Sequence, residues 1–423
     1  MITVKGVDIG YGIPKVIVPV MEQTKENIMD KVAGAILTPC DAIELRLDSF
    51  EELFDSKKLK ELLKDVYAAV CDKILLVTIR TSFEGGLVEV TSESYAQLLD
   101  TIMESGCVDL LDMEEALVCD ESIEKAKKLG IATVMSCHHF EGTPSEEEMQ
   151  ETLARMEQRG ASIAKMAVMA NEYKDLLTLL RTARTAQRTM SVPRILISMG
   201  QYGMASRIAG EAYGIAMTFA SDKCASAPGQ LNVYEVQSIL KGIHTIRQSD
   251  RLVYLTGFMG SGKSSVGRNL GLMTGQMVYE MDDMIEEAAG CTISEIFAKQ
   301  GEEEFRRRET DVLKYLSTQK GGIVSCGGGA VTRSENVSLM KKSGDIFYLT
   351  ANADTIMKRL AHQIDKRPLL QGEDPESRVR DLMAQRQEVY TKTSNFMIST
   401  DGKTLDQVTL ETILMVEKAS EVE

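Results

Sequence analysis

The fold of the second half of the chain is decided by the stretch Gly257-Phe258-Met259-Gly260-Ser261-Gly262-Lys263-Ser264. Two glycines flank four residues and Lys-Ser follows, which is the pattern of a phosphate-binding loop. The apolar run at residues 252–255 predicts a buried strand before the loop, and residues 265–273 predict a helix after it. In that order, backbone N–H groups and the helix N-terminus face an anion. We expect Lys263 to reach the outer phosphates of a nucleotide and the Ser264 hydroxyl to bind Mg²⁺.

The composition is that of a soluble globular protein. The chain has 423 residues, of which 43% are hydrophobic and 26% charged, so we expect two domains. The formal net charge of −15 argues against nucleic acid or an anionic membrane as the main partner. The eight cysteines are scattered without a C-x-x-C pair, which indicates reduced thiols in the cytoplasm. No apolar run predicts a signal peptide or a membrane-spanning helix.

Residues 15–221 repeat one pattern, in which a short aliphatic run is followed by a helical segment. Alternating strands and helices imply a parallel sheet, and eight units in this length predict a (β/α)₈ TIM barrel. An open doubly wound sheet is the alternative, although no G-x-G-x-x-G follows the first run, which disfavours a dinucleotide fold. The strand-like runs are residues 16–20, 42–48, 74–80, 109–113, 132–138, 163–168, 194–199 and 216–221.

In such a barrel we expect the chemistry at the carboxyl ends of the strands. Lys165 lies within an otherwise apolar run. It is either a chance charge on an exposed edge strand or a desolvated lysine with a lowered pKa, suited to forming a Schiff base with a ketone. His138 ends the fifth run and is either a general base or a satisfied structural imidazole. Other charged candidates at or near strand ends are Glu44, Arg46, Arg80 and Glu84.

The pieces that stand out in the first half are Glu44-Leu45-Arg46-Leu47-Asp48, Thr78-Ile79-Arg80 with Glu84-Gly85-Gly86, Ser136-Cys137-His138, Lys165, and the late motifs around Arg207 and residues 225–230. Together they resemble the type I 3-dehydroquinate dehydratases, over about residues 14–242. The resemblance implies dehydration of 3-dehydroquinate to 3-dehydroshikimate without a metal or an organic cofactor. Lys165 would form an imine with the ring ketone, His138 would move the proton, and Glu84 would orient His138.

The same resemblance implies further contacts and shows two departures. His139 stands where this family commonly has Asp, so we expect the surroundings of the neighbouring imidazole to differ from the family pattern. Pro19 stands near the end of the first strand, where many relatives have a small hydroxyl residue. The implied substrate contacts are Arg207, Ser226 and Gln230 for the carboxylate, and Glu44, Arg46 and Arg80 for the ring hydroxyls.

The second half continues with glycines and arginines after the phosphate-binding loop. A buried strand runs into Gly327-Gly328-Gly329, where the backbone can approach a ligand closely. The polar stretch at residues 363–377 predicts a mobile lid, and Arg386 and Tyr390 follow on a helix. Strands of one parallel sheet are predicted at residues 252–255, 277–282, 323–326, 345–349 and 396–398.

Asp282, Phe305-Arg306-Arg307, the glycine run, Arg367-Pro368-Leu369-Leu370 and Arg386 together resemble shikimate kinase, over about residues 252–418. By this resemblance Arg306 and Arg386 would grip the shikimate carboxylate, with backbone contacts from Gly328 and Gly329. Asp282 would bind the ring hydroxyls and orient or deprotonate the attacking one. Lys263 and Arg367 would stabilise charge on the transferring phosphoryl group. The implied ATP contacts are Gly257, Met259, Gly260, Ser261, Gly262, Lys263, Ser264, Ser265 and Arg367.

One departure concerns the metal, because Glu280 stands where these kinases usually have an Asp linked to Mg²⁺ through water. The carboxylate is kept but its side chain is one methylene longer, which changes its reach toward the metal.

The sequence therefore predicts an α/β bifunctional enzyme, with the dehydratase barrel at residues 1–247 and, at residues 248–423, a P-loop kinase with a five-stranded parallel sheet. The expected small-molecule partners are 3-dehydroquinate and shikimate, with ATP and Mg²⁺ as cofactors of the kinase half. Neither nucleic acid nor a membrane is expected as a partner, and the expected location is the cytoplasm. Barrel dehydratases of this type are often dimers, which extends the expectation to a homodimer through the barrel.

Two alternatives stay open on the sequence. The first is a Schiff-base aldolase barrel fused to another small-metabolite P-loop kinase. The second is that one domain binds or regulates without turnover.

Overall fold

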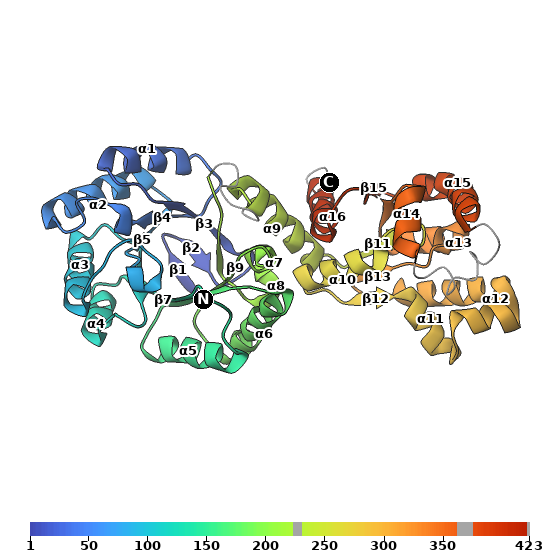
Figure 1. Ribbon diagram of the computed structural model, residues 1–423, viewed down its shortest axis with the longest axis horizontal. Coiled ribbons are helices and arrows are strands. Elements are labelled where there is room, and N and C mark those ends of the chain that lie inside the picture. The colour runs from blue at the N-terminus through green and yellow to red at the C-terminus, as the bar shows by residue number, and fades with distance from the viewer. Residues whose placement is uncertain (223–230, 362–374, 421–423) are drawn as a thin grey trace. The chain divides into compact units, whose positions relative to one another are not determined.

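The structure is a computed structural model that describes residues 1–222, 231–361 and 375–420 (Figure 1). The chain divides into two compact units, Met1–Lys241 and Gly242–Glu423. This division falls inside helix α9 (Val233–Gln248). The domain boundary expected between residues 247 and 248 stays a prediction.

The first unit is a nearly closed barrel of eight parallel strands, in the order β10-β3-β4-β5-β6-β7-β8-β9. A parallel bridge between Arg194 and Ile215 joins its two edges. All eight predicted strands are present, with ends shifted by at most a few residues, so the open doubly wound sheet is wrong. The strands are β3 (Lys15–Val20), β4 (Ala42–Arg46), β5 (Ile74–Thr78), β6 (Leu110–Glu114), β7 (Ala132–His139), β8 (Ile163–Met169), β9 (Arg194–Met199) and β10 (Met217–Phe219).

Helices surround the strands (Figure 1). Side-chain caps fix where several of them begin: Thr24 accepts from the N–H of Asn27, and Ser145 forms a capping box with Glu148. Two 3₁₀ turns, η1 (Leu47–Ser49) and η2 (Ser82–Glu84), follow β4 and β5. The helices of this unit are α1 (Lys25–Ala35), α2 (Ser56–Val70), α3 (Ser92–Ser105), α4 (Asp120–Lys128), α5 (Glu146–Gln158), α6 (Tyr173–Thr189), α7 (Met204–Ile208) and α8 (Gly210–Tyr213).

A hairpin of β1 (Ile2–Val4) and β2 (Val7–Ile9) precedes the barrel and was not predicted. Its two-residue turn places Lys5 at φ 46° and Gly6 at φ 76°, which matches the turn type that suits tight hairpins. The apolar residues of the hairpin pack against the apolar side chains that face into the barrel at the amino ends of its strands. The Lys-Gly pair between two alternating runs was the signal that could have predicted it.

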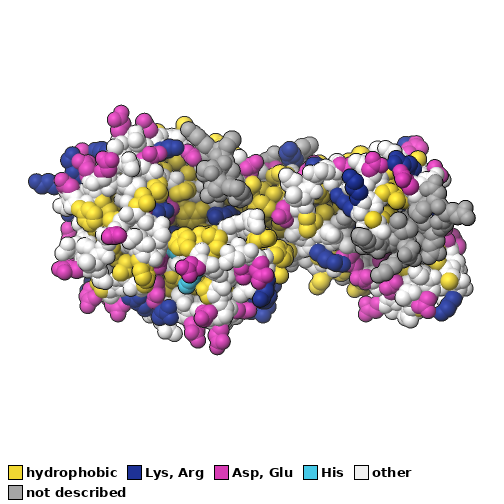
Figure 2. Space-filling model, in the orientation of Figure 1, with side chains coloured by type: hydrophobic (Ala, Val, Ile, Leu, Met, Phe, Trp, Pro, Cys, Tyr) yellow, Lys and Arg dark blue, Asp and Glu magenta, His cyan; other side chains and the backbone are white. Residues whose placement is uncertain are grey.

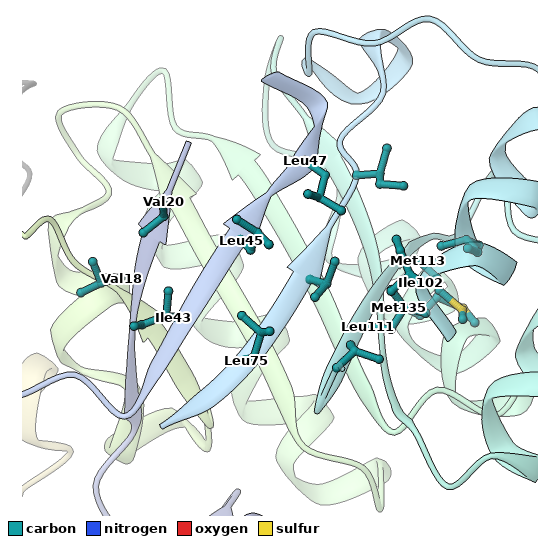
Figure 3. Packing of buried hydrophobic residues seen from close by; sticks show 14 of the residues in the cluster. Val18, Val20, Ile43, Leu45, Leu47, Leu75, Ile102, Leu111, Met113 and Met135 are labelled. Atoms are coloured by element: carbon teal, nitrogen blue, oxygen red, sulfur yellow. The ribbon is translucent and has the colours of Figure 1, made fainter. Parts of the chain in front are cut away.

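The inward-facing positions of the strands change character along the barrel axis. At the amino ends they are apolar, as with Ile74 and Leu76 on β5 or Ile163 on β8, and they form one buried cluster. At the carboxyl ends they are polar, as with Thr78 and Lys165. Because side chains alternate along a strand, the residues between these positions face the surrounding helices. Figure 3 shows part of that outer core, including Val18, Val20, Ile43, Leu45, Leu75, Leu111, Met113 and Met135.

The second unit is built on a parallel sheet of five strands in the order β12-β13-β11-β14-β15, as predicted. Helix α12 contains a non-helical residue, Gly301 at φ 84°, that divides it in two. The strands are β11 (Leu252–Thr256), β12 (Val278–Glu280), β13 (Gly322–Ser325), β14 (Gly344–Thr350) and β15 (Phe396–Ser399). The helical elements are α10 (Lys263–Thr274), α11 (Met281–Ala289), α12 (Ile293–Leu316), η3 (Ala330–Thr332), α13 (Ser334–Ser343), α14 (Ala353–Leu360), α15 (Pro375–Thr393) and α16 (Leu405–Ser420).

One strand prediction needs correction. Residues 277–282 were expected as a strand that ends in carboxylates, but β12 ends at Glu280 and helix α11 begins at Met281. Asp282 therefore lies in the first turn of a helix, where the helix dipole favours a negative charge. The lid expected at residues 363–377 falls almost entirely outside the described residues.

Candidate active sites

Lys165 lies on β8 in the polar layer of the barrel, with 4% of its surface exposed. Its Nζ donates to Asp112 Oδ2 at 3.0 Å and lies 3.7 Å from Glu44 Oε1. The ring of Phe219 lies over the ammonium, 5.1 Å from Nζ to the ring centroid. Because β8 pairs with both β7 and β9, the interpretation of Lys165 as a charge on an exposed edge strand is wrong.

Arg80 is the cation at the centre of this cluster and is also 4% exposed. Its Nη2 donates to Asp112 Oδ1 at 2.8 Å, and its Nη1 lies 3.0 Å from Glu84 Oε2 and 3.1 Å from Glu114 Oε1. Burial opposes the charged form, but these carboxylates raise the pKa of Arg80. Because Nη1 and Nη2 both donate to protein groups, Arg80 holds the cluster together, and its contact with a ring hydroxyl stays a prediction.

His138 and Glu84 form the adjacent pair, with Nδ1 and Oε2 2.8 Å apart. Burial, together with the charges of Arg80 and Lys165, lowers the pKa of His138 to about 2. Burial raises the pKa of Glu84 to about 8, with Arg80 opposing the shift. Both shifts disfavour charge on the pair, so His138 is a neutral imidazole, and only the ring nitrogen that carries no hydrogen can accept a proton.

The Glu84-Gly85-Gly86 sequence is required by close packing around this pair. A Cβ on Gly85, which has φ 78°, would lie 2.5 Å from the ring of Phe140. That ring stacks on His138 with centroids 6.0 Å apart. A Cβ on Gly86 would lie 1.8 Å from the Arg80 carbonyl oxygen. The two glycines let the loop after β5 bring Glu84 to His138.

The remaining barrel candidates are more spread out. Arg46 pairs with Asp48, from Nε to Oδ1 at 2.8 Å, and lines a cavity of about 240 Å³ together with Pro19. Arg207 lies on α7, where burial lowers the pKa of its guanidinium. Glu44 is buried and accepts from the Thr78 hydroxyl at 2.9 Å. Ser226 and Gln230 lie outside the described residues.

The His139 departure is directed away from this site. Alternation along β7 places His139 on the same face as Cys137, a member of the outer core, and its Nε2 lies 3.9 Å from the Cys137 sulfur. The neighbouring His138 points into the barrel instead. His139 therefore faces away from the His138–Glu84 pair.

In the second unit the phosphate-binding loop has the predicted strand before it and helix after it. Lys263 begins α10, and its Nζ donates to the carbonyl oxygens of Gly257 at 3.0 Å and Phe258 at 3.1 Å. Gly257 has φ 142°, and a Cβ there would lie 2.4 Å from the Leu349 carbonyl oxygen. The loop opens onto a cavity of about 690 Å³, which is large enough for a nucleotide. Its lining includes Met259, Gly260, Ser261, Gly262, Lys263, Ser264, Ser265, Glu280, Asp282 and Gly328.

A second cavity of about 250 Å³ adjoins the first, and Met259, Asp282 and Gly328 line both. Arg306 and Arg386 also line the smaller cavity. Two basic groups beside a run of glycines suit a small carboxylate, and the shared Asp282 lies between that carboxylate site and the phosphate-binding loop.

Arg306 is held in place before any ligand binds. Its Nη1 donates to Glu309 Oε2 at 2.9 Å, and its Nη2 donates to Glu302 Oε1 at 3.0 Å. Burial raises the pKa of Glu309, although Arg306 opposes the shift. Arg386 Nη1 donates to the Gly328 carbonyl oxygen at 3.2 Å, which fixes the glycine run against α15.

The donors near the loop fit Mg²⁺. The hydroxyls of Ser264 and Ser325 lie 3.2 Å apart, and the carboxylates of Glu280 and Asp282 line the same cavity. Mg²⁺ takes oxygen ligands and keeps several waters and phosphate oxygens, so it needs few protein ligands. Over the described ranges, no group of three His, Cys, Asp or Glu residues could hold a metal by itself.

Comparison with known families separates the two halves. Residues 16–247 match the family model described as type I 3-dehydroquinase. The chain belongs to the type I 3-dehydroquinase family. It is 41% identical over 244 residues to the 3-dehydroquinate dehydratase of Enterococcus faecalis, an alignment that covers 57% of this chain and 96% of the relative. A crystal structure of the type I enzyme from Clostridium difficile covers 57% of this chain and 97% of its own, with 35% identity and a TM-score of 0.56.

Beyond the dehydroquinase barrel, residues 259–417 match the shikimate kinase family model. The chain is therefore a bifunctional shikimate-pathway enzyme, a lyase joined to a phosphotransferase, as the sequence predicted. The two family matches disfavour an aldolase joined to another kinase. The kinase match implies ATP as the phosphoryl donor.

The face of the molecule shown in Figure 2 carries both signs of charge. Lys and Arg side chains are interspersed there with Asp and Glu side chains. None of the helices in the described ranges combines the length and apolar character needed to cross a bilayer.

Sequence reasoning missed several residues of the dehydroquinase cluster. Asp112 and Glu114 alternate with apolar residues on β6 in the same way as Glu44 and Arg46 on β4, so the signal was present. In the kinase unit, Arg359, Thr400 and Lys403 line the larger cavity from elements distant in sequence, and no local pattern marks them. Arg367 lies outside the described residues, so its role stays a prediction.

Proposed function

We propose that Lys165 of the barrel forms an imine with the ring ketone of 3-dehydroquinate and that His138 transfers the proton. The observation that carries this proposal is the buried arrangement of one lysine and one neutral imidazole around a shared carboxylate cluster. The crystal structure from Clostridium difficile contains covalently modified comenic acid, which supports covalent chemistry in such barrels.

The protonated imine is an electron sink, so the adjacent ring C–H becomes acidic. His138 accepts that proton while Glu84 holds its Nδ1, and it then returns a proton to the departing hydroxyl. Arg207, together with Ser226 and Gln230, binds the carboxylate, and Glu44 and Arg46 bind ring hydroxyls. The barrel needs no metal or organic cofactor for these steps.

In the kinase unit we propose that shikimate occupies the smaller cavity, with its carboxylate between Arg306 and Arg386. Asp282 orients the attacking hydroxyl toward the phosphoryl group at the loop. Lys263 and Arg367 stabilise the transferring charge, since phosphoryl transfer depends on positioning and electrostatics. MgATP occupies the larger cavity, with Ser264 as a metal ligand and Glu280 facing it.

Three further predictions belong to the same proposal. The domain boundary lies near residues 247 and 248, the protein works in the cytoplasm, and the barrel forms a homodimer. Size-exclusion chromatography with light scattering on the full chain tests the last of these, and a monomer at micromolar concentration would contradict it.

Borohydride trapping tests the barrel. The full chain is incubated with 3-dehydroquinate and sodium borohydride, and the adduct is located by peptide mass spectrometry. We expect one adduct on Lys165 and loss of dehydratase activity, with shikimate phosphorylation unchanged. An adduct elsewhere, or none, removes Lys165 from this role.

The Asp282→Asn variant tests the kinase. We expect phosphorylation of shikimate to fall by about 100-fold or more, while binding of a fluorescent ATP analogue is unchanged. Dehydratase activity of the same protein is the internal control. Retained phosphorylation would exclude Asp282 as the group that orients the hydroxyl.

A further inference from the structure

Asp112 is the charged group nearest to the nitrogen that becomes the imine. Its Oδ2 lies 3.0 Å from Lys165 Nζ, whereas Glu44 Oε1 lies 3.7 Å away and already accepts from the Thr78 hydroxyl. Asp112 is fully buried on β6, which pairs with β5 and β7 in the barrel sheet. Its position is therefore fixed by the sheet.

The other oxygen of Asp112 is held by two further donors. Oδ1 accepts from Arg80 Nη2 at 2.8 Å and from the Ser136 hydroxyl at 2.7 Å. With the lysine, three donors face one carboxylate, and each of them favours the ionised form. Burial alone would raise the pKa of Asp112, but the charges of Arg80 and Lys165 outweigh it and lower that pKa.

The charge on the lysine nitrogen is the same at the start and at the end of imine formation. A protonated amine and a ketone give a protonated imine and one water, so a single positive charge stays on Nζ. Only the transient neutral amine and the carbinolamine lack it. An anion fixed 3.0 Å from this nitrogen therefore stabilises the resting enzyme and the protonated imine, but not a neutral imine.

We propose that Asp112 is the permanent counter-anion of Lys165 and keeps the imine nitrogen protonated through the dehydration. This inference rests on the proposed imine chemistry of Lys165. Asp112 contacts the reacting nitrogen, stays ionised and transfers no proton. The proton released from the C–H goes to His138, which keeps the electron sink and the base on separate groups.

The Asp112 carboxylate also connects the imine nitrogen with the proton acceptor, His138. Arg80 joins Asp112 to Glu84, and Glu84 contacts His138, in a continuous series of buried contacts between 2.8 and 3.0 Å. The series fixes the imine nitrogen and the proton acceptor relative to one another. Such positioning has large effects on rate because small displacements of reacting groups are costly.

The test compares Asp112→Asn with Glu114→Gln in the full chain. The Glu114 carboxylate also accepts from Arg80, at 3.1 Å, and from the N–H and hydroxyl of Thr81, so it belongs to the same buried cluster. Among the described residues, no hydrogen bond or ion pair joins it to Lys165. Each variant removes one buried negative charge beside Arg80. Only Asp112→Asn removes the anion from the lysine nitrogen.

For Asp112→Asn we expect kcat to fall on the order of 100-fold or more, with KM for 3-dehydroquinate changed by less than about threefold. At about pH 8 the fraction trapped by borohydride falls about tenfold. At about pH 6 it partly recovers, because the higher proton concentration protonates the imine nitrogen without help from the lost anion. Glu114→Gln is expected to keep the trapped fraction within about twofold of wild type at both pH values. Circular dichroism and thermal unfolding establish that each variant is folded.

Equal trapping by Asp112→Asn and wild type at both pH values would overturn the proposal. Equal loss of trapping in Asp112→Asn and Glu114→Gln would also overturn it, because loss of any buried charge from the cluster would then explain the effect. If Asp112→Asn does not fold, wild-type trapping decides: it must stay constant between about pH 6 and about pH 9, and a fall over that range overturns the counter-anion role. Failure of wild type to give any Lys165 adduct refutes the imine chemistry itself. The two failures are therefore distinguishable.

Discussion

His138 Nδ1 lies 2.8 Å from Glu84 Oε2, and this single contact decides which imidazole nitrogen can act as a base. When Glu84 is ionised, it accepts a hydrogen from Nδ1, and the lone pair of Nε2 is free to take a proton from substrate. When Glu84 is protonated, it donates to Nδ1, and the remaining imidazole hydrogen occupies Nε2. The protonation state of Glu84 therefore controls the tautomer of His138.

Dehydratase activity is expected to rise with pH through the pKa of Glu84. Burial raises that pKa from the ordinary carboxyl value to about 8. Below this value most molecules carry the proton on Glu84 and hold His138 in the inactive tautomer. We expect kcat/KM for 3-dehydroquinate to increase by about tenfold per pH unit below the pKa and to level off above it. A steady-state pH profile of the full chain measures this.

The Glu84→Gln variant separates the tautomer effect from other titrations. Arg80 Nη1 donates to the same Glu84 oxygen that faces Nδ1, so the amide oxygen of the glutamine takes that position and accepts from Nδ1 at every pH. The active tautomer is then held throughout, and the rising limb should disappear. A variant that keeps the wild-type rising limb would assign that limb to another group. The kinase activity of the same protein serves as the control for denaturation of the sample.

The sequence was sufficient to predict both folds because their signals are local. Eight apolar runs alternate with helical segments, and one loop has its full spacing between a strand and a helix. Lys165 was visible as a charge inside an apolar run, and His138 was visible as a polar residue at a strand end. What could not be predicted is which charged groups meet: Arg80 lies among three carboxylates from η2 and β6, and its expected contact with a ring hydroxyl stays a prediction. These charged groups come together only when the strands close into a barrel, and no local sequence pattern specifies which of them will be neighbours.

The kinase site shows the same limit at a smaller scale. Asp282 was recognised, but it was placed at a strand end rather than in the first turn of α11, since apolar residues before it continue the strand pattern. Arg306 and Glu309 could be placed on one helix face from their spacing, and the structure pairs them at 2.9 Å. The kink at Gly301 was not apparent, because a single glycine does not by itself predict a break in a helix.

Removing the Ser136 hydroxyl is expected to loosen the dehydratase cluster. This hydroxyl donates to Asp112 Oδ1 at 2.7 Å and accepts from Arg80 Nη1 at 2.9 Å, all within the buried layer. Loss of both contacts costs about 1–3 kcal/mol, so Ser136→Ala should lower the Tm of the barrel transition by about 2–10 °C. Differential scanning calorimetry of the full chain measures the shift.

Ser198→Ala is the matched control for this change. Ser198 is 1% exposed on β9, and its hydroxyl has no hydrogen-bond partner within the part of the chain that the structure describes. Removing it should leave the Tm within about 2 °C of wild type or raise it. Equal destabilisation by both substitutions would show that the Ser136 contacts contribute little.

A methyl group on Gly329 is expected to weaken shikimate binding specifically. The Cβ of Gly329→Ala would lie 2.1 Å from Arg306 Nη1, a guanidinium held by Glu309 and Glu302. Arg306 must move and lose at least one of its contacts. Because charge-assisted hydrogen bonds contribute roughly 1.5–3 kcal/mol, KM for shikimate should rise about tenfold or more, while KM for ATP changes little. The control is Gly267→Ala on α10, where a Cβ would have ordinary contacts of 3.5 Å or longer; a similar rise in that variant would contradict the steric explanation.

The ion pair between Arg268 and Glu280 should compete with Mg²⁺ for the longer carboxylate. Arg268 Nε lies 3.1 Å from Glu280 Oε1, and the arginine side chain is 70% exposed. Glu280 must leave this pair to face a hydrated metal at the loop, and exposed pairs contribute up to about 1 kcal/mol. Arg268→Ala should therefore lower the Mg²⁺ concentration for half-maximal binding of a fluorescent ATP analogue by about two- to fivefold.

Lys299→Ala removes the same charge from an exposed pair with Glu295 on α12 and should have no such effect. If both variants shift the Mg²⁺ midpoint equally, net charge explains the result. If neither does, Glu280 has no part in binding the metal, and the extra methylene has separated this carboxylate from the role that an aspartate would have.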